Sequence, residues 1–247
     1  MLLLAGSVRF LSQGAAKLGY NWQWVRIPRY LYGSGPDGLL AGPLLQGLGV
    51  TLEISVLSLI LSLVIGLLTA LFRLSGSPVA RRLAFVYLEL IRNTPLLIQI
   101  FILYFVFAPI LDIERFTAAV LALSLFEGAY ASEIIRAGIL GIPEGQWEAA
   151  ASLGLSWTQS YRYVILPQAL RQMAPPLTSQ GISLVKDSAL VSTIAIYDLT
   201  MQGQQIVAET FLTFEIWFVV AAIYLALTLS LSALVKLLEW RLADYEL

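Results

Sequence analysis

Cysteine and histidine are both absent from this chain of 247 residues. The absence of cysteine excludes disulfides, thiolate metal sites and thiol nucleophiles. The absence of histidine removes the most common metal ligand, the usual general base and any Ser-His-Asp triad. We therefore expect no catalytic residue and no metal site, and the sequence argues against a self-contained enzyme.

Charged residues are also scarce, at 13% of the chain against 58% hydrophobic residues, and the mean hydropathy is +0.80. Soluble domains have about 25% charged residues, so this composition predicts a membrane protein with several spans. The net charge of -1 gives no electrostatic reason to expect nucleic acid as a partner. No phosphate-binding loop of the form GxxxxGK(S/T) occurs, so ATP would have to be bound by another subunit.

Five apolar segments are long enough to cross the hydrocarbon core of a bilayer, which needs about 20 residues of helix. The predicted spans cover residues 47–72, 83–110, 116–140, 177–197 and 211–238. The fourth is only weakly apolar, and Pro175-Pro176 before it is expected to end a separate interfacial helix over residues 161–173. We expect an all-α membrane protein with about five transmembrane helices, divided into an N-terminal arm over 1–43, a transmembrane domain over 44–241 and a C-terminal tail over 242–247.

The N-terminal arm mixes basic and aromatic side chains, a combination that is typical of the interface between lipid and water. The residues concerned are Arg9, Lys17, Arg26, Arg29, Trp22, Trp24, Tyr30 and Tyr32. An arm that lies on the membrane surface and a loose tail both fit this pattern. Residues 33–38 are rich in glycine with one proline, which predicts a turn-rich break before the first span.

The lysines and arginines of the short loops predict the orientation in the membrane. The loop at residues 73–82 carries three arginines and is expected in the cytoplasm, whereas the turn at 109–115 has one arginine and two acidic residues and is expected outside. The loop at 143–167 and the C-terminus then lie in the cytoplasm, and five spans place the N-terminus outside. The basic residues of the arm argue mildly against this last assignment.

The loop at residues 143–167 differs in composition from the apolar segments around it. Residues 148–153 are good helix formers and Gly154 is a natural C-terminal stop, which predicts a helix of at most two turns. Three consecutive alanines, Ala149 to Ala151, present little bulk, so the backbone of a partner can approach closely. On these grounds alone, a docking helix and a solvated alanine-rich turn remain equally open.

Glu148-Ala149-Ala150, followed by Gly154 and by Leu166-Pro167, resembles the EAA signature of permease subunits of ATP-binding-cassette (ABC) importers. Val164 stands where the pattern usually has isoleucine. Other strings resemble the branch of that family that transports polar amino acids, and the resemblance extends over about residues 47–241. These strings are YLELIRNTPLL at 87–97, GAYASEIIRAGI at 128–139, LPQA at 166–169 and KDSALVS at 186–192.

The resemblance implies a type I importer permease in which the loop at 143–167 contains a cytoplasmic coupling helix. The residues expected to couple to the ATPase are Gly145, Glu148, Ala149, Ala150, Gly154, Leu166 and Pro167. The implied partners are a cytoplasmic ABC ATPase dimer, a second permease subunit that is identical or homologous, and an extracytoplasmic amino-acid-binding protein. ATP and Mg are expected on the partner ATPase, so this chain would bind no cofactor. The implied location is the bacterial cytoplasmic (inner) membrane.

Ionisable side chains within the predicted spans are costly unless they are paired or reached by water. Glu89 and Arg92 are three residues apart on one helix, as are Glu133 and Arg136, so we expect two structural ion pairs rather than substrate contacts. Glu127 has no basic residue three or four positions away. It must face a cavity, a cation on another helix or a proton; the amino group or basic side chain of a substrate and the side chain of Lys186 are both candidates.

The weakly apolar fourth span carries a second group of polar residues. Lys186 and Asp187 are adjacent and point in different directions on a helix, so each needs another partner. A face toward a wet pathway and a face packed against another subunit are both open. The candidate pathway residues are Glu127, Ser183, Lys186, Asp187, Ser188 and Ser192.

These features favour a permease subunit of an ATP-driven, binding-protein-dependent amino-acid uptake system, which forms half of the translocation pathway. The alternative is a proton-coupled secondary transporter in which Glu127, Lys186 and Asp187 form a proton relay. That alternative gives no role to the alanine-rich loop, and five spans without an internal repeat fit it poorly.

Overall fold

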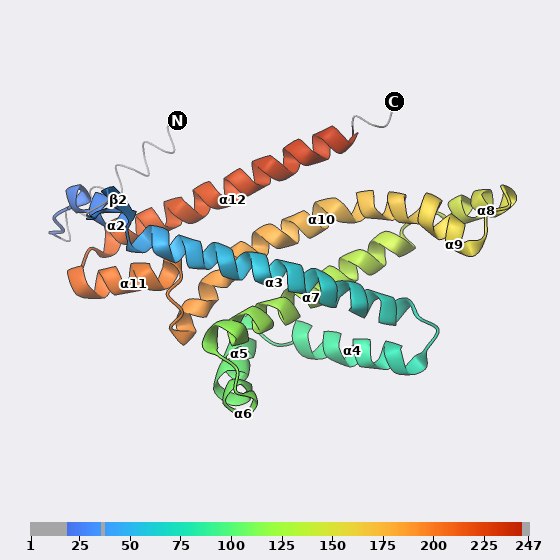
Figure 1. Ribbon diagram of the computed structural model, residues 1–247, viewed down its shortest axis with the longest axis horizontal. Helices are drawn as coiled ribbons and strands as arrows, with labels where there is room; N and C mark the ends of the chain where they lie inside the picture. Colours follow the sequence, from blue (N-terminus) through green and yellow to red (C-terminus); the bar gives the residue numbers. More distant parts are fainter. Residues whose placement is uncertain (1–18, 36–37, 244–247) are drawn as a thin grey trace.

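The computed structural model describes residues 19–35 and 38–243, and its long helices run lengthwise through an elongated bundle (Figure 1). Residues 1–18, with Arg9 and Lys17, and most of the predicted C-terminal tail lie outside the described residues. Of the short η segments, η1 and η4 are 3-10 helices and η2 and η3 are π-helical. The elements are η1 (Trp24–Arg26), α2 (Pro28–Leu31), β1 (Tyr32–Gly35), β2 (Gly38–Ala41), α3 (Pro43–Leu74), α4 (Pro78–Arg92), α5 (Leu96–Phe101), η2 (Ile102–Phe107), α6 (Ala108–Leu111), α7 (Arg115–Leu140), α8 (Glu144–Ser152), α9 (Trp157–Ser160), η3 (Tyr161–Ile165), α10 (Leu166–Asp187), η4 (Ser188–Ile194), α11 (Leu199–Thr210) and α12 (Thr213–Ala243).

Within the described residues, α3, α7 and α12 are each long and apolar enough to cross a membrane. The segment from α4 to α6 supplies a fourth crossing if its two bent parts are taken together. α10 is too polar to qualify by composition, yet its 22 residues extend about 33 Å and it runs lengthwise like α3 and α7 (Figure 1). The all-α membrane fold expected from the sequence is confirmed.

The second predicted span, residues 83–110, is not one straight helix, and this part of the prediction was wrong. α4 ends at Arg92, α5 begins at Leu96, and the two parts are bent by 106°. Pro95 disfavours helical geometry at the residue before it. The side chains of Asn93 and Thr94 then satisfy the last carbonyls of α4, with Nδ2 to Glu89 O and Oγ1 to Leu90 O each 2.8 Å. The break is therefore built from local hydrogen bonds.

The predicted break at Pro175-Pro176 does not occur. α10 begins at Leu166 and continues through both prolines to Asp187, so the separate interfacial helix at 161–173 and the fourth span at 177–197 were wrong as drawn. Proline cannot donate a hydrogen bond to the preceding turn, but its fixed φ angle is close to the helical value. Thr178 Oγ1 donates to the carbonyls of Ala174 and Pro175, at 2.9 and 2.8 Å, and binds the turn together.

Two further elements were not predicted as regular structure. Around the predicted turn, β1 and β2 pair as antiparallel strands, with Tyr32 opposite Ala41 and Gly35 opposite Gly38. Residues 199–210 form α11, which Asp198 caps by accepting a hydrogen bond from Met201 N at 2.8 Å. Phe211, with a positive φ of 59°, then turns the chain into α12.

The centre of the bundle is the contact between α3 and α7, where small residues let the backbones approach. A Cβ atom at Gly66 would lie 2.8 Å from Ala131 Cβ, and one at Gly128 would lie 2.9 Å from Ile65 Cγ2. Ser124 reaches across from α7, with its Oγ 3.4 Å from Ser58 O. Gly128 and Ala131 therefore serve the close packing of α3 against α7.

Candidate functional site: the coupling helix and the buried carboxylates

The loop predicted to couple to an ATPase contains α8, a helix of nine residues at one end of the bundle (Figure 1). It begins at Glu144 rather than at Glu148, and the acidic side chain in the first turn complements the helix dipole. At its other end, Leu155 N donates to Ala150 O at 3.2 Å and Gly154 N donates to Ala151 O at 2.9 Å. This is a Schellman motif, and the φ of +74° at Gly154 explains the glycine at that position.

Most of the residues predicted to contact the ATPase are exposed. Trp147 and Ala150, three positions apart, form the face of α8 that packs against the bundle, and Ala150 is buried. Leu166 is half-buried at the start of α10. The rest of the predicted set is on the surface: Gly145, Glu148, Ala149, Gly154 and Pro167. α8 therefore presents a small-residue surface with one carboxylate, which suits the close approach of a partner.

Three aromatic rings hold α8 against the segment that follows it. Trp147 stacks on Trp157 with ring centroids 6.4 Å apart, and Trp157 stacks on Tyr161 at 5.5 Å. Trp157 and Leu153 are nevertheless exposed by 71% and 80%, beside the alanines of α8. Sequence reasoning missed these two as members of the surface, although large apolar residues in a loop were a usable signal.

A hollow of about 490 Å³ lies between the end of α7 and α8. Glu144, Trp147 and Glu148 line it from α8, and Ile139 and Leu140 line it from α7. The hollow mixes carboxylates with apolar side chains. It extends the α8 surface toward the membrane-spanning helix that α8 follows.

Glu133 on α7 is the centre of an ion-pair network that joins three helices. Arg136 Nη2 lies 3.1 Å from Glu133 Oε2, which confirms the predicted pair on α7. Arg73 at the end of α3 and Arg92 at the end of α4 both pair with Glu133 Oε1, the second at 3.4 Å. One carboxylate on α7 thus joins the C-terminal ends of α3 and α4.

The predicted ion pair between Glu89 and Arg92 was wrong. Glu89 Oε2 instead accepts a hydrogen bond from Asn93 Nδ2 at 2.9 Å, and Arg92 turns toward Glu133. The Arg92 guanidinium also lies over the Tyr130 ring, 5.9 Å from its centroid. Arg92 gains two interactions in this position: an ion pair with the Glu133 carboxylate and a cation–π contact with Tyr130. An exposed ion pair with Glu89 on the same helix would stabilise it less.

Glu127 on α7 is buried, with 1% of its surface exposed, and its main partner was not predicted. Gln180 Nε2 on α10 donates to Glu127 Oε2, and the Asp187 carboxyl is close enough to interact with Glu127 electrostatically. Glu127 Oε1 has no hydrogen-bond partner within the described chain. Lys186, the alternative partner considered above, is exposed instead. The site therefore joins two carboxyl groups and an amide, with one buried oxygen left for a further donor.

The two faces of α10 differ in chemistry. Ser183 and Asp187 follow Gln180 by three and seven positions, so the three share one face of the helix, and Gln180 reaches Glu127. The same spacing in the sequence could have predicted that Gln180 lies on the polar face of α10. Ser188 and Ser192 are buried and donate to Val185 O and Ala189 O, each at 2.8 Å. Both are buried within the single chain, as Glu127 is, and their predicted place on the pathway stays a prediction.

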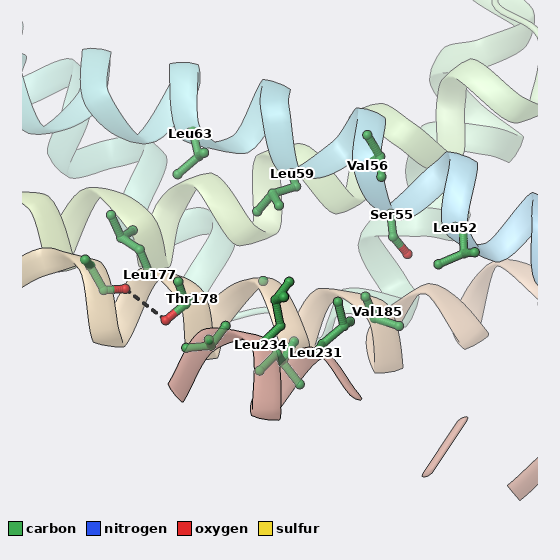
Figure 2. Close-up of a pocket in the computed structure, with 14 residues that line it drawn as sticks. Leu52, Ser55, Val56, Leu59, Leu63, Leu177, Thr178, Val185, Leu231 and Leu234 are labelled. Atoms are coloured by element: carbon green, nitrogen blue, oxygen red, sulfur yellow. Dashed lines mark hydrogen bonds between the residues drawn. The ribbon is translucent and has the colours of Figure 1, made fainter. Parts of the chain in front are cut away.

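The opposite face of α10 forms an apolar groove with α3 and α12, of about 450 Å³ (Figure 2). Figure 2 shows Leu52 and Leu59 of α3 and Leu231 and Leu234 of α12 turned toward this space, with Thr178 of α10 among the few polar groups. An apolar groove offers no partner to the charged groups of an amino acid. The polar cluster around Glu127 is the better candidate for contact with a polar solute.

The chain also matches a known family over most of its length. The family described as "Binding-protein-dependent transport system inner membrane component" matches residues 62–244, about three quarters of the chain. The chain belongs to this family. It is thus a multi-pass inner-membrane permease subunit of an ABC importer, and such importers work with an ATPase and a substrate-binding protein.

Individual relatives agree with this assignment. The glutamine transport system permease protein GlnP of Escherichia coli (strain K12) is 45% identical over 202 residues, covering 81% of this chain and 92% of GlnP. The L-cystine transport system permease protein TcyB of Bacillus subtilis (strain 168) is 40% identical over 206 residues, covering 82% of this chain and 88% of TcyB.

Solved structures show the same architecture. A chain from the crystal structure of an amino acid ABC transporter with histidines is 40% identical, with a TM-score of 0.76, and the match covers 81% of this chain and 94% of that one. The MetNI methionine ABC transporter in an inward-facing conformation is similar in fold, with a TM-score of 0.63 at 21% identity. The type I importer fold expected from the sequence is confirmed.

Proposed function

We propose that this permease takes up a polar amino acid in an ATP-driven, binding-protein-dependent cycle. The observation that carries the proposal is α8, a short helix with an exposed small-residue surface that is capped at Gly154 and braced by Trp147, Trp157 and Tyr161. The relatives whose names specify glutamine and cystine support an amino acid as the solute.

The proposed assembly contains two permeases, identical or homologous, on a cytoplasmic ABC ATPase dimer. Each permease forms half of the pathway, and ATP and Mg are held by the ATPases. The N-terminus lies outside and the C-terminus in the cytoplasm. This orientation is supported by Arg73, Arg81 and Arg82 near the α3–α4 turn, at the end where the bundle also carries α8 (Figure 1).

In the proposed cycle, an extracytoplasmic binding protein delivers the amino acid to the paired permeases. ATP binding draws the two ATPases together, and α8 of each permease moves with the ATPase that it contacts. The motion turns the pathway from inward-facing to outward-facing, and hydrolysis returns it. The aromatic stack from Trp147 to Tyr161 would transmit the movement of α8 to η3 and α10.

We place the amino group or basic side chain of the solute at Glu127. The unpartnered Oε1 atom and the nearby Asp187 carboxyl supply negative charge, and Gln180 fixes the position of the other Glu127 oxygen. Glu127→Gln should raise the KM for uptake several-fold while ATPase activity stays coupled. Glu114→Gln, an exposed carboxylate at the start of α7, is the matched control. An unchanged KM in Glu127→Gln would remove the solute from this site.

A proton-coupled secondary transporter is the second candidate, and the grouping of Glu127 with Asp187 is the observation in its favour. Uptake into vesicles that contain the permease, with and without the ATPase subunit and internal ATP, separates the two. We expect uptake only when both are present. Uptake driven by a proton gradient without ATPase would establish the alternative.

The coupling role of α8 has its own test in the same vesicles. Glu148→Lys and Gly154→Trp should each abolish most ATP-driven uptake, because they place charge or bulk on the docking surface. Glu209→Lys makes the same charge change at an exposed position of α11. Normal uptake by Glu148→Lys and Gly154→Trp would separate α8 from the ATPase contact.

A further inference from the structure

A segment before the first span packs against α3, α11 and α12 near the start of α3 and of α12. We call residues 19–35 and 38–41 the strap. Ile27 of the strap is buried among side chains of α3, α11 and α12, including Leu44, Leu199 and Ile216. Gly42 N donates to Leu31 O at 2.7 Å, where the strap joins α3. The family match begins only at residue 62, so the strap is not part of the region that defines the family.

The carboxylate of Glu215 at the start of α12 is the main polar attachment of the strap. Glu215 is fully buried, and it accepts hydrogen bonds from the Tyr20 hydroxyl and, at 2.6 Å, from Gln23 N. Tyr20 also packs edge-on against Phe214, with ring centroids 4.7 Å apart. These contacts fix the strap on α12 rather than leaving it free to move as a tail.

The strap continues the membrane-facing surface of α12. α12 packs little against its own chain, since only 6% of its most apolar 18-residue window is buried. Trp22 and Trp24 stack with centroids 5.8 Å apart, and both lie 6.4 Å from Phe218 of α12. The two tryptophans therefore add to a row of aromatic rings that starts on a transmembrane helix. Aromatic side chains in such a place favour the level of the lipid headgroups.

The rest of the strap surface has the same chemistry. Val25 and Leu39 are exposed by 89% and 79%, which would be unfavourable in water but suits the boundary between headgroups and acyl chains. Arg26 and the exposed Arg29 are its only charged residues in the described part, and it carries no acidic side chain there. Guanidinium groups beside apolar and aromatic side chains complement lipid phosphates.

We propose that the strap is a lipid-binding element that lies in the headgroup layer beside the start of α12 and anchors that end of the helix to the membrane surface. Its occupant is the phospholipid interface itself, with Val25 and Leu39 dipping toward the acyl chains and Arg29 at the phosphates. The proposal needs α12 to span the bilayer, but it depends neither on which solute is transported nor on how α8 couples.

The absence of native cysteine makes the test direct. V25C and L39C are labelled separately with a nitroxide in the full transporter assembly, reconstituted in vesicles of phosphatidylethanolamine and phosphatidylglycerol. Collision with oxygen, which concentrates in lipid, is compared with collision with a water-soluble nickel chelate. L67C on the exposed side of α3 gives the lipid reference, and E209C on α11 gives the water reference at the same end of the bundle.

We expect V25C and L39C to collide several-fold more with oxygen relative to the nickel chelate than E209C does, and to approach L67C. A ratio equal to that of E209C would overturn the proposal, because the strap would then project into water. If the soluble binding protein shields the two labels from the chelate, the strap is a protein-docking surface, which also overturns it. ATP-driven uptake measured in the same vesicles reports separately on the transport function.

Discussion

Arg92 at the end of α4 and Glu133 in α7 form an ion pair, with Nη1 3.4 Å from Oε1, although 41 positions separate them in the chain. The same carboxylate also binds Arg73 and Arg136. Three guanidinium groups therefore depend on one acceptor where α3, α4 and α7 converge.

Replacing this acceptor should loosen the three helices together. Glu133→Gln leaves three arginines without a counter-charge, and because the groups are partly exposed we expect a loss of about 1–2 kcal/mol in unfolding free energy. Thermal unfolding of the purified permease measures it. Glu89→Gln is the matched control and should change stability by less than about 0.5 kcal/mol, since Asn93 is the bonding partner there. Equal shifts for both variants would contradict the network.

The C-terminal cap of α8 should be sensitive to any side chain at Gly154. A Cβ atom there meets nothing within 4 Å, so Gly154→Ala acts only through the positive φ, at a cost of about 1–2 kcal/mol. We expect amide exchange in the last turn of α8 to accelerate roughly tenfold, as that energy implies. Gly76→Ala, also in open space but without a positive φ, should leave exchange in α8 unchanged. Similar exchange in both variants would refute the cap.

Two glycines of α3 should respond to alanine in opposite directions. Gly66→Ala places its Cβ 2.8 Å from Ala131 Cβ, which has no flexible end to move aside, and should destabilise the permease by about 1–3 kcal/mol. Gly49→Ala meets nothing within 4 Å and should stabilise α3 by up to about 1 kcal/mol. Denaturation of the two variants in the same detergent measures both changes in unfolding free energy. An unchanged unfolding free energy in Gly66→Ala would disprove close contact between α3 and α7.

The attachment of the strap should be insensitive to pH through the neutral range. Burial, together with the hydrogen bond and charge of Glu215, raises the pKa of Tyr20 to about 12. A phenol whose pKa is raised on folding contributes fully below its ordinary value of about 10, and the contribution disappears as the pH rises toward 12. The mobility of a V25C label should therefore stay constant up to about pH 10 and increase above it. The Y20F variant should show no such increase, and a transition near neutral pH in the unsubstituted strap would contradict this contact.

Prolines show how far the sequence could predict this fold. The predicted spans ran through Pro95 and broke at Pro175-Pro176, whereas the structure breaks only at Pro95. There the side chains of Asn93 and Thr94 supply replacement hydrogen bonds for the end of α4. At Pro175 no such cap precedes, and packing of α10 on α7 carries the helix through. Local chemistry predicts where a helix can end; the surrounding helices decide whether it does.

The candidate sites divide in the same way. The helix at Glu148 and its stop at Gly154 follow from local residues, and the structure has both. The partners of Arg92 and Glu127 lie on other helices, at Glu133 and Gln180, and intrahelical spacing could not identify them. Long-range pairing in a membrane bundle depends on which helices become neighbours, and a single sequence does not contain that information directly.

The two prolines in α10 have a mechanical consequence. Pro175 and Pro176 have no N–H, so they cannot donate the helical hydrogen bonds to the carbonyls of residues 171 and 172. Two backbone hydrogen bonds are therefore missing in the middle of α10. The half of α10 next to η3 can therefore tilt against the half that bears Gln180 and Asp187 more easily than an unbroken rod would allow. If α8 couples to an ATPase as proposed, a bend at these prolines would let the half of α10 next to η3 change its angle while the half that bears Gln180 and Asp187 stays in place.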